Sequence, residues 1–298
     1  MKDELTPLER GKRYFSGERV DRLPYGLVGV ETGCSLYGVN PKEVLHSAEL
    51  AMLVQKQIVE EFGVDSVGFG PDLKGIAEAL GTEVYYPEHS ICYVKTPILN
   101  DYRQLEKLKE LSIYSQGRLP MILETLQKLK ETYGETHPVS NAIAGPLSTA
   151  AAIRGTEAML KDMKRNEENL HELLAFTVET NLKWVKHVWD RCEIKVSISD
   201  PVASGSLISH QNFLKFEKPY LKKLCEGIEK ITGKKPSLHI CGKTRAIWED
   251  LKEIGISGFL LDNCENLEDF KNTVGDKIAI SGNIDPTNAM RFGIPRDI

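Results

Sequence analysis

The sequence predicts a parallel α/β fold, because two patterns alternate along its 298 residues. Short apolar runs, typical of buried strands, are separated by longer amphipathic segments with the period of an α-helix. This alternation favours a parallel sheet with helices packed outside it. The predicted strands span residues 24–30, 64–69, 139–143, 194–198, 237–240, 258–261 and 278–281, and the predicted helices span residues 41–62, 119–133, 156–164, 167–190, 210–232 and 244–254.

Residues 83–96 depart from this alternation. Two short runs rich in Tyr, Val and Ile face each other across a polar turn there, and we predict an inserted β-hairpin. Seven core strands are one fewer than a (β/α)8 barrel contains. We therefore predict a TIM barrel that forms a single domain over residues 1–298. Its last strand and helix are expected beyond Ile298.

The composition is that of a globular protein and argues against several classes of function. Hydrophobic residues make up 41% of the chain, charged residues 27%, and the formal net charge is −5. No basic cluster stands out, so we expect no nucleic-acid partner. No run of about 18 apolar residues exists, so we expect no membrane span. The polar N-terminus and six scattered cysteines predict reduced thiols and a cytoplasmic location.

Polar residues follow several of the predicted strands. In a barrel the carboxyl ends of the strands share one rim, and active sites form there. Asp200, Asp285 and Glu31 each follow a predicted strand, and we predict them as catalytic residues. Asn283 and Asn141 are our candidates for substrate binding. An Asp before Pro is also a good helix N-cap, so capping is the alternative role of Asp200 and Asp285.

His239 and Cys241 are the most informative pair in the chain. They are two residues apart at the end of a predicted strand, so their side chains point to the same face. Imidazole and thiolate are ligands that zinc prefers. Packing of a small apolar Cys and a carbonyl-bonded His remains the structural alternative. Cys264 follows the next predicted strand and could reach the same rim.

Four passages carry a family resemblance that extends over most of the chain. The chain resembles the uroporphyrinogen decarboxylase superfamily, and within it the branch of zinc-dependent corrinoid methyltransferases. This resemblance implies a distorted (β/α)8 barrel. The passages are Gly17-Glu18-Arg19-Val20-Asp21-Arg22-Leu23-Pro24; Gly145-Pro146-Leu147 with Arg154-Gly155-Thr156-Glu157; Ser199-Asp200-Pro201-Val202-Ala203-Ser204-Gly205; and His239-Ile240-Cys241-Gly242 with Ser281-Gly282-Asn283-Ile284-Asp285-Pro286.

The segment after the first predicted strand separates the branches of the superfamily. Decarboxylases carry an Arg-rich segment there, because their porphyrinogen substrate bears eight carboxylates and Arg pairs with carboxylates through two hydrogen bonds. Here the corresponding segment contains Glu31, and no Arg occurs between Arg22 and Arg103. This difference argues against porphyrinogen decarboxylation.

The methyltransferase resemblance implies a zinc ion held by His239 and Cys241. The family's third ligand is a Cys near the last barrel strand, which would lie beyond Ile298. Cys264 in its place, or weak or absent zinc binding, are the alternatives. Zinc would activate a small thiol acceptor, such as coenzyme M, toward a methylated corrinoid carried by a partner protein. Asp200 and Asp285 would orient a ligand. A porphyrinogen decarboxylase and a non-catalytic partner of a corrinoid protein are the alternative functions.

Overall fold

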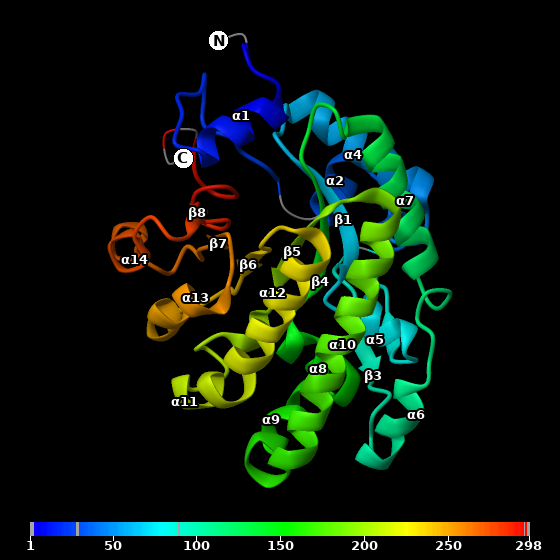
Figure 1. Ribbon diagram of the computed structural model, residues 1–298. Coiled ribbons are helices and arrows are strands. Elements are labelled where there is room, and N and C mark those ends of the chain that lie inside the picture. The colour runs from blue at the N-terminus through cyan, green and yellow to red at the C-terminus, as the bar shows by residue number, and fades with distance from the viewer. Residues whose placement is uncertain (1–2, 28–29, 89, 295, 297–298) are drawn as a thin grey trace.

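The computed structural model describes residues 3–27, 30–88, 90–294 and 296, and its centre is a sheet of six parallel strands (Figure 1). The strands pair in the order in which they follow along the chain, β1-β4-β5-β6-β7-β8. Parallel neighbours need a crossover between them, and helices form these crossovers. The strands are β1 (Val67–Asp72), β4 (Val139–Ala144), β5 (Lys195–Ser199), β6 (Ser237–His239), β7 (Gly258–Leu260) and β8 (Ala279–Ser281).

Helices cover the outer face of the sheet, and short helices also form part of the segments that follow the carboxyl ends of the strands. The α-helices are α1 (Pro7–Phe15), α2 (Val30–Tyr37), α3 (Pro41–Val44), α4 (Ala48–Phe62), α5 (Gly75–Ala79), α6 (Leu105–Lys109), α7 (Leu119–Tyr133), α8 (Pro146–Arg154), α9 (Thr156–Arg165), α10 (Glu167–Cys192), α11 (His210–Asn212), α12 (Lys218–Thr232), α13 (Trp248–Ile254) and α14 (Leu267–Val274). Short 3₁₀ turns are η1 (Tyr102–Gln104), η2 (Pro201–Ala203) and η4 (Arg245–Ile247), and η3 (Phe213–Glu217) is a π-helical turn.

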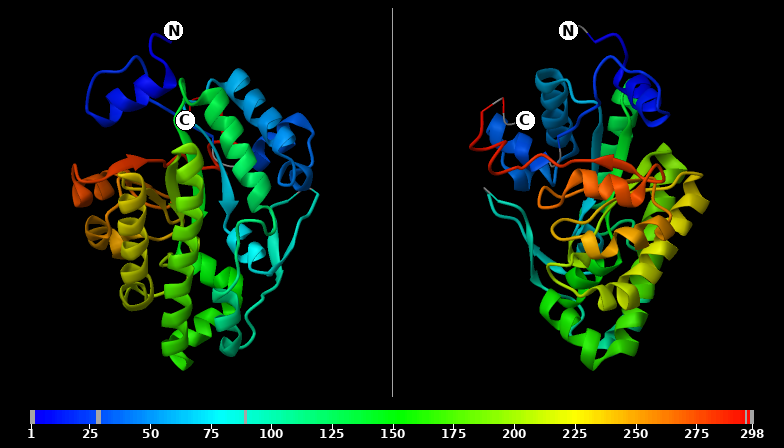
Figure 2. Two further views of the ribbon diagram at one scale, coloured as in Figure 1. Left: turned by 45° about the vertical axis from the view of Figure 1, so that its right-hand side comes forward. Right: turned by 90° about the vertical axis from the view of Figure 1, so that its left-hand side faces the viewer.

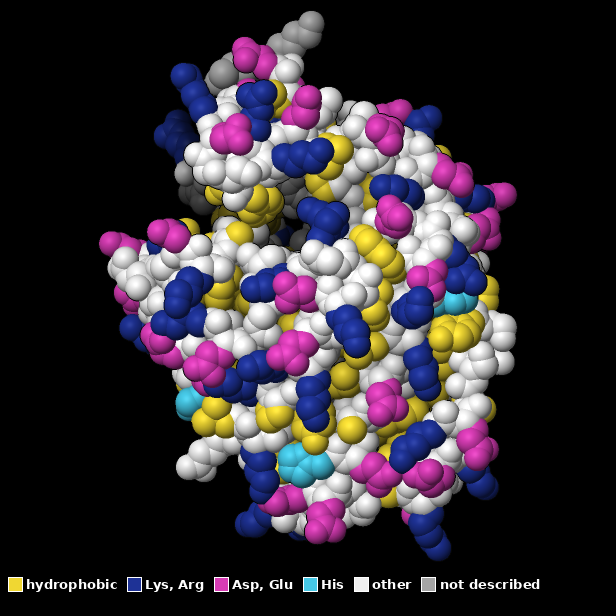
Figure 3. All heavy atoms as spheres, viewed as in Figure 1, with side chains coloured by type: hydrophobic (Ala, Val, Ile, Leu, Met, Phe, Trp, Pro, Cys, Tyr) yellow, Lys and Arg dark blue, Asp and Glu magenta, His cyan; other side chains and the backbone are white. Residues whose placement is uncertain are grey.

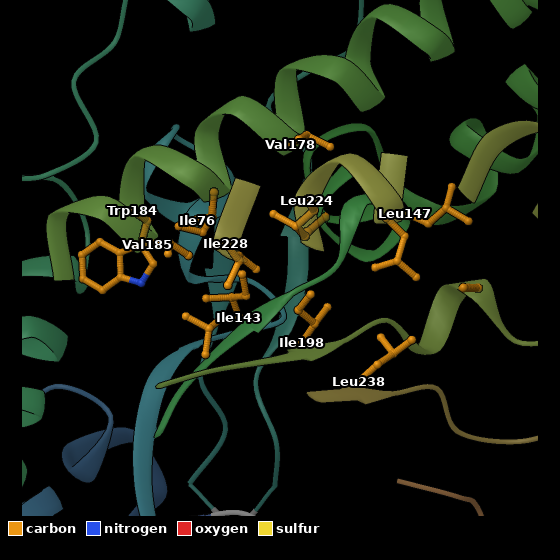
Figure 4. Close-up of a cluster of buried hydrophobic side chains, with 14 of the residues drawn as sticks. Ile76, Ile143, Leu147, Val178, Trp184, Val185, Ile198, Leu224, Ile228 and Leu238 are labelled. Carbon is orange, nitrogen blue, oxygen red and sulfur yellow. The ribbon is translucent and has the colours of Figure 1, made fainter. Parts of the chain in front are cut away.

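The main core lies between the sheet and two long helices, α10 and α12, which pack side by side (Figure 2). Ile143, Ile198 and Leu238 occupy matched positions on β4, β5 and β6. They point toward these helices, where Trp184 and Leu224 lie (Figure 4). Because successive strand residues face opposite sides, Ser199 and His239 point away from this helix layer.

The predicted fold is confirmed in its order of strands and helices, with one exception. No strand forms at residues 24–27, and helix α2 begins at Val30; residues 28 and 29 lie outside the described residues. The segment is held instead by Asp65. Its carboxylate accepts a hydrogen bond from the Tyr25 N–H at 2.8 Å, and its own N–H donates to the Tyr25 carbonyl. These two hydrogen bonds between Tyr25 and Asp65 take the place of the strand pairing that the apolar run at 24–30 predicted.

The inserted hairpin is also confirmed, as the antiparallel strands β2 (Glu83–Tyr85) and β3 (Tyr93–Thr96). Two predicted helices are interrupted. The helix at 41–62 breaks before Ser47, whose side chain caps the new helix α4. The helix at 210–232 contains the π-helical turn η3, which inserts an extra residue into the helical repeat.

The described surface carries mixed charge. Lys and Arg side chains alternate with Asp and Glu over the face shown in Figure 3. None of the described helices is long and apolar enough to span a membrane.

Candidate functional site

His239 ends strand β6 and is half-buried on the face of the sheet away from α10 and α12. Its ring nitrogen Nδ1 lies 3.1 Å from the carbonyl oxygen of Leu260 on the neighbouring strand β7. A carbonyl can only accept, so Nδ1 carries the proton in this contact and Nε2 keeps its lone pair. Metal-binding histidines are commonly oriented by such a bond through their other nitrogen.

Cys241 follows two residues later, before a sharp turn at Gly242. Gly242 has φ +75°, and a Cβ added there would lie 2.8 Å from the hydroxyl oxygens of both Ser204 and Ser206. Only glycine fits this close approach of the loop after β5. Burial raises the pKa of the half-buried Cys241 thiol, and the nearby Asp262 carboxylate raises it further. The thiol is therefore protonated at neutral pH unless a cation binds to it.

Asp262 connects the loop after β7 to the loop that carries Cys241. Its carboxylate accepts hydrogen bonds from the backbone N–H of Gly242 at 2.7 Å and of Cys264 at 2.9 Å. Burial opposes ionisation of Asp262, but these donors hold the pKa of its carboxyl below the ordinary value. The sequence places Asp262 directly after the predicted strand at 258–261, on the expected catalytic rim, but gives it no specific role.

The described residues supply only part of a metal site. Nowhere among them do three His, Cys, Asp or Glu side chains gather closely enough to hold a metal ion. Cys264 is exposed, and the structure does not bring it into a three-ligand group with His239 and Cys241. Burial and the Asp262 carboxylate raise the pKa of the Cys264 thiol to about 11. The His239 and Cys241 donor pair suits zinc, but catalytic zinc sites use three protein ligands.

Asn283 and Asp285, after β8, are both engaged in local hydrogen bonds. The Asn283 amide donates to the carbonyl oxygens of Asp262 at 3.2 Å and Glu265 at 2.7 Å. The Asp285 carboxylate accepts from the backbone N–H groups of Thr287 and Asn288, each at 2.8 Å. The Asn288 N–H is the main cause of the lowered pKa of Asp285. Asn283 therefore joins two loops, and Asp285 caps its own turn, which is the alternative role that its position before Pro indicated.

Asp200 is completely buried behind the rim. Its carboxylate accepts from the Leu147 N–H at 3.0 Å, and from the Ser148 N–H at 2.8 Å and hydroxyl at 2.6 Å. These are the first free N–H groups of α8, where a negative charge is favourable. In this structure Asp200 anchors the start of α8, and its catalytic role stays a prediction. Its backbone N–H donates to the His239 carbonyl at 2.8 Å.

Glu217 is a second buried acid that sequence reasoning missed. It ends the π-helical turn η3, is 0% exposed, and lies beside Asp200. Burial raises the pKa of Glu217 well above its ordinary value, and the Asp200 charge adds to this effect. A signal was present in the sequence, because Glu217 falls on the apolar side of its helix between Phe213 and Leu221.

Asn141 lies away from His239, and the predicted role of Glu31 falls on a side chain outside the described structure. Asn141 is fully buried on the opposite face of the sheet, where its Oδ1 accepts from the Trp184 indole N–H at 3.3 Å. This contact places Asn141 in the packing between β4 and α10. Glu31 lies in helix α2, and its side chain is outside the described part of the structure.

Asp72, at the carboxyl end of β1, is a further residue that the sequence prediction missed. It adopts φ +49°, a left-handed conformation that is uncommon for a non-glycine residue. Its carboxylate accepts from the Lys74 N–H at 2.6 Å and from the Arg118 guanidinium at 2.7 Å. Strained backbone at a strand end often marks a functional position. The prediction ended this strand at Phe69, so Asp72 was not recognised as a strand-end residue.

A parallel sheet in chain order, with polar side chains at its carboxyl ends, defines an α/β protein of the barrel type. A profile of the family Uroporphyrinogen decarboxylase (URO-D) matches residues 6–298, so the chain belongs to the uroporphyrinogen decarboxylase family. The solved structure of a methyltransferase from Methanosarcina mazei has the same fold, with a TM-score of 0.86 and 22% identity, covering 98% of this chain and 86% of that chain. The predicted family and fold are both confirmed.

Curated relatives come from two groups. A methylcobamide:CoM methyltransferase, MtbA, of Methanosarcina acetivorans is 27% identical over 299 residues, which cover 99% of this chain and 87% of that protein. A uroporphyrinogen decarboxylase of Ruthia magnifica subsp. Calyptogena magnifica is 25% identical over 251 residues, covering 80% of this chain and 70% of that protein.

Proposed function

We propose that this protein transfers a methyl group from a methylated corrinoid protein to a small thiol. The observation that carries the proposal is the pairing of His239 with Cys241 on one rim. The Leu260 carbonyl orients the His239 ring through Nδ1, which leaves Nε2 available, and the half-buried Cys241 thiol follows two residues later in the chain. The full-length similarity to a methylcobamide:CoM methyltransferase supports the same reaction class.

The cofactor of this reaction would be a zinc ion held by His239 Nε2 and Cys241 Sγ. When bound, zinc lowers the pKa of a coordinated thiol and so supplies a thiolate at neutral pH. The predicted third ligand beyond Ile298 stays a prediction, because no third His, Cys, Asp or Glu joins this pair among the described residues.

The residues around the pair have separate tasks in this proposal. Asp262 holds the turn after Cys241 through the Gly242 N–H, which fixes the direction of the thiol. Gly242 lets the loop after β5 approach closely. Both His239 and Cys241 are half-buried, so neither residue is sealed in the core, and the proposal requires that a small thiol and a partner-bound corrinoid reach them.

The described arginines argue against a porphyrinogen substrate. Arg22, in the segment before α2, bonds to the carboxylates of Asp3 and Asp65. Arg118, which directly precedes α7, bonds to Asp72 at the end of β1 and to Glu78 in α5. A substrate with many carboxylates would have to compete with these internal partners, whereas a small thiol with one anionic group needs far fewer cations.

The test combines metal binding with methyl transfer from free methylcobalamin to 2-mercaptoethanesulfonate. Cobalt(II) replaces zinc as a probe, because thiolate-bound cobalt absorbs in the near ultraviolet. The wild type should bind cobalt with this band and consume methylcobalamin. Cys241→Ser should lose both signals. Cys264→Ser is the matched control, since Cys264 lies in the next loop and is exposed, and it should keep both.

Two outcomes would contradict the proposal. Cobalt binding and methyl transfer that survive in Cys241→Ser would exclude the His239 and Cys241 pair as the site. Decarboxylation of a porphyrinogen without added metal would favour the activity of the other group of relatives.

A further inference from the structure

Asp200 and Glu217 form an unusual pair, because two acidic side chains meet with no exposed surface. Both residues are 0% exposed. Asp200 has three donors from α8, namely the N–H groups of Leu147 and Ser148 and the Ser148 hydroxyl. Neither carboxyl oxygen of Glu217 has a partner with good hydrogen-bond geometry among the described residues, and the nearby Leu147 N–H offsets only part of the rise in the pKa of Glu217.

Two buried negative charges side by side would be strongly unfavourable. An ionised carboxylate without donors costs several kcal/mol to bury, and a second carboxylate in contact adds repulsion. A single proton removes both problems, because a neutral carboxylic acid can donate to its carboxylate neighbour. The donors around Asp200 stabilise its charge, so the proton belongs on Glu217. The raised pKa of Glu217, caused by burial and then by Asp200, agrees with this assignment.

We infer that Glu217 is a neutral carboxylic acid that donates its proton to Asp200 and thereby positions the end of β5 behind His239. The backbone of Asp200 transmits the effect, because its N–H donates to the His239 carbonyl at 2.8 Å. The same carboxylate anchors the N-terminus of α8. Gly145 permits this close packing, since a Cβ there would lie 2.1 Å from the Asp200 carboxylate.

The π-helical turn explains how Glu217 reaches its partner. The extra residue in η3 rotates the chain between α11 and α12, so that Glu217 is buried together with Phe213 and Phe216. In a regular helix the register of these residues would differ by about 100°. π-helical turns of this kind are frequently found at functional sites. Glu217 is therefore a positioning residue, acting on His239 through Asp200.

Infrared spectroscopy tests the proton directly. A protonated carboxyl group absorbs above the amide band, and this band shifts in D₂O. The wild type at neutral pH should show the band, and Glu217→Gln should lack it. Glu226→Gln is the matched control, since Glu226 is exposed on the same helix α12, and it should keep the band. A wild type without the band, or a band that persists in Glu217→Gln, would overturn the assignment.

The positioning role is tested by the alkylation rate of Cys241 in a Cys264→Ser background. Glu217→Gln keeps a donor of the same shape, so its rate should match the wild type. Glu217→Ala removes the donor, and its rate should change at least threefold. Leu224→Ala, a core variant on the same helix, controls for general destabilisation and should leave the rate unchanged. Equal rates in Glu217→Ala and the wild type would contradict the role, whichever function the protein has.

Discussion

The polar side chains at the ends of β5 and β6 differ in how far they are exposed to solvent. Behind β5, Asp200 and Glu217 lie beside each other without solvent exposure, and Asp200 bonds to the start of α8. At β6, His239 and Cys241 are half-buried and keep reactive atoms outside their hydrogen bonds. A sealed polar group must find every partner within the protein, whereas a half-exposed one can exchange partners with solvent or ligand. We call the first region, Asp200 with Glu217 and the start of α8, the frame; the second region is where the proposed function places the chemistry.

The largest expected effect comes from breaking the frame with Gly145→Ala. The backbone at Gly145 has φ −77°, which any residue tolerates, so only the contact matters. The new Cβ would lie 2.1 Å from the Asp200 carboxylate and must displace it from α8. We expect a loss of about 3 kcal/mol in the free energy of unfolding, measured with urea.

Gly11→Ala is the matched control for that variant. Gly11 lies inside α1, and an added Cβ would meet nothing closer than the Pro138 ring at 3.9 Å. Alanine stabilises a helix interior by roughly 0.5–1 kcal/mol relative to glycine. Equal stabilities for the two variants would mean that the frame around Asp200 is looser than described.

The second prediction concerns how the free energy of unfolding depends on pH through the buried Glu217. Burial and Asp200 raise the pKa of Glu217 in the folded protein above its ordinary 4.5. Above pH 4.5 the unfolded chain releases this proton while the folded protein keeps it, so stability falls as the pH rises. The slope reaches about 1.4 kcal/mol per pH unit for one proton. Below pH 4.5 both states are protonated and the contribution is complete.

Comparing wild type with Glu217→Gln isolates this effect from all other titrations. Urea unfolding between about pH 5 and pH 8 should show the wild type losing stability relative to the variant. Glu226→Gln, at an exposed position on α12, should follow the wild type. Curves for the wild type and Glu217→Gln that stay parallel would show that Glu217 is ionised throughout.

The same contrast explains how far the sequence predicts this molecule. Strand and helix order followed from apolar periodicity, because each sheet-facing run must bury its side chains. His239 and Cys241 were identified because a spacing of two fixes a shared face. Asp262 was placed on the rim without a specific role, and Asp72, at the end of β1, was missed because the predicted strand ended at Phe69.

Tertiary contacts decided the remaining outcomes. The role inferred for Glu217 depends on its contact with Asp200, which follows strand β5 and is distant from Glu217's own helix in the sequence pattern. Asn141 was assigned to substrate binding, yet its strand position places it against Trp184. The predicted first strand failed because the Asp65 side chain holds Tyr25 in an irregular segment. None of these long-range pairings has a local sequence signal.

A smaller loss of stability is expected from Asn283→Ala, because Asn283 lies in the half-buried region near β7 and β8 and bonds to residues outside the frame. The change removes two donors that join the loops after β7 and β8. Because Asn283 is half-buried, the loss should be about 1 kcal/mol. Asn272→Ala, at an exposed position on α14, controls for the substitution. A higher KM for the thiol with unchanged stability would instead support the predicted substrate-binding role.

The smallest change in stability is expected from Asp285→Asn, and it separates capping from catalysis. The Asp285 carboxylate accepts from the Thr287 and Asn288 N–H groups, and these donors lower its pKa, so it is ionised at neutral pH. Asparagine caps a helical turn about as well as aspartate, so the free energy of unfolding should change by less than about 0.5 kcal/mol. If Asp285 only caps, the rate of methyl transfer from methylcobalamin stays the same. If the carboxylate acts on the substrate, as its strand-end position predicted, the rate falls at least tenfold in a protein of unaltered stability, since the amide keeps the cap but not the charge.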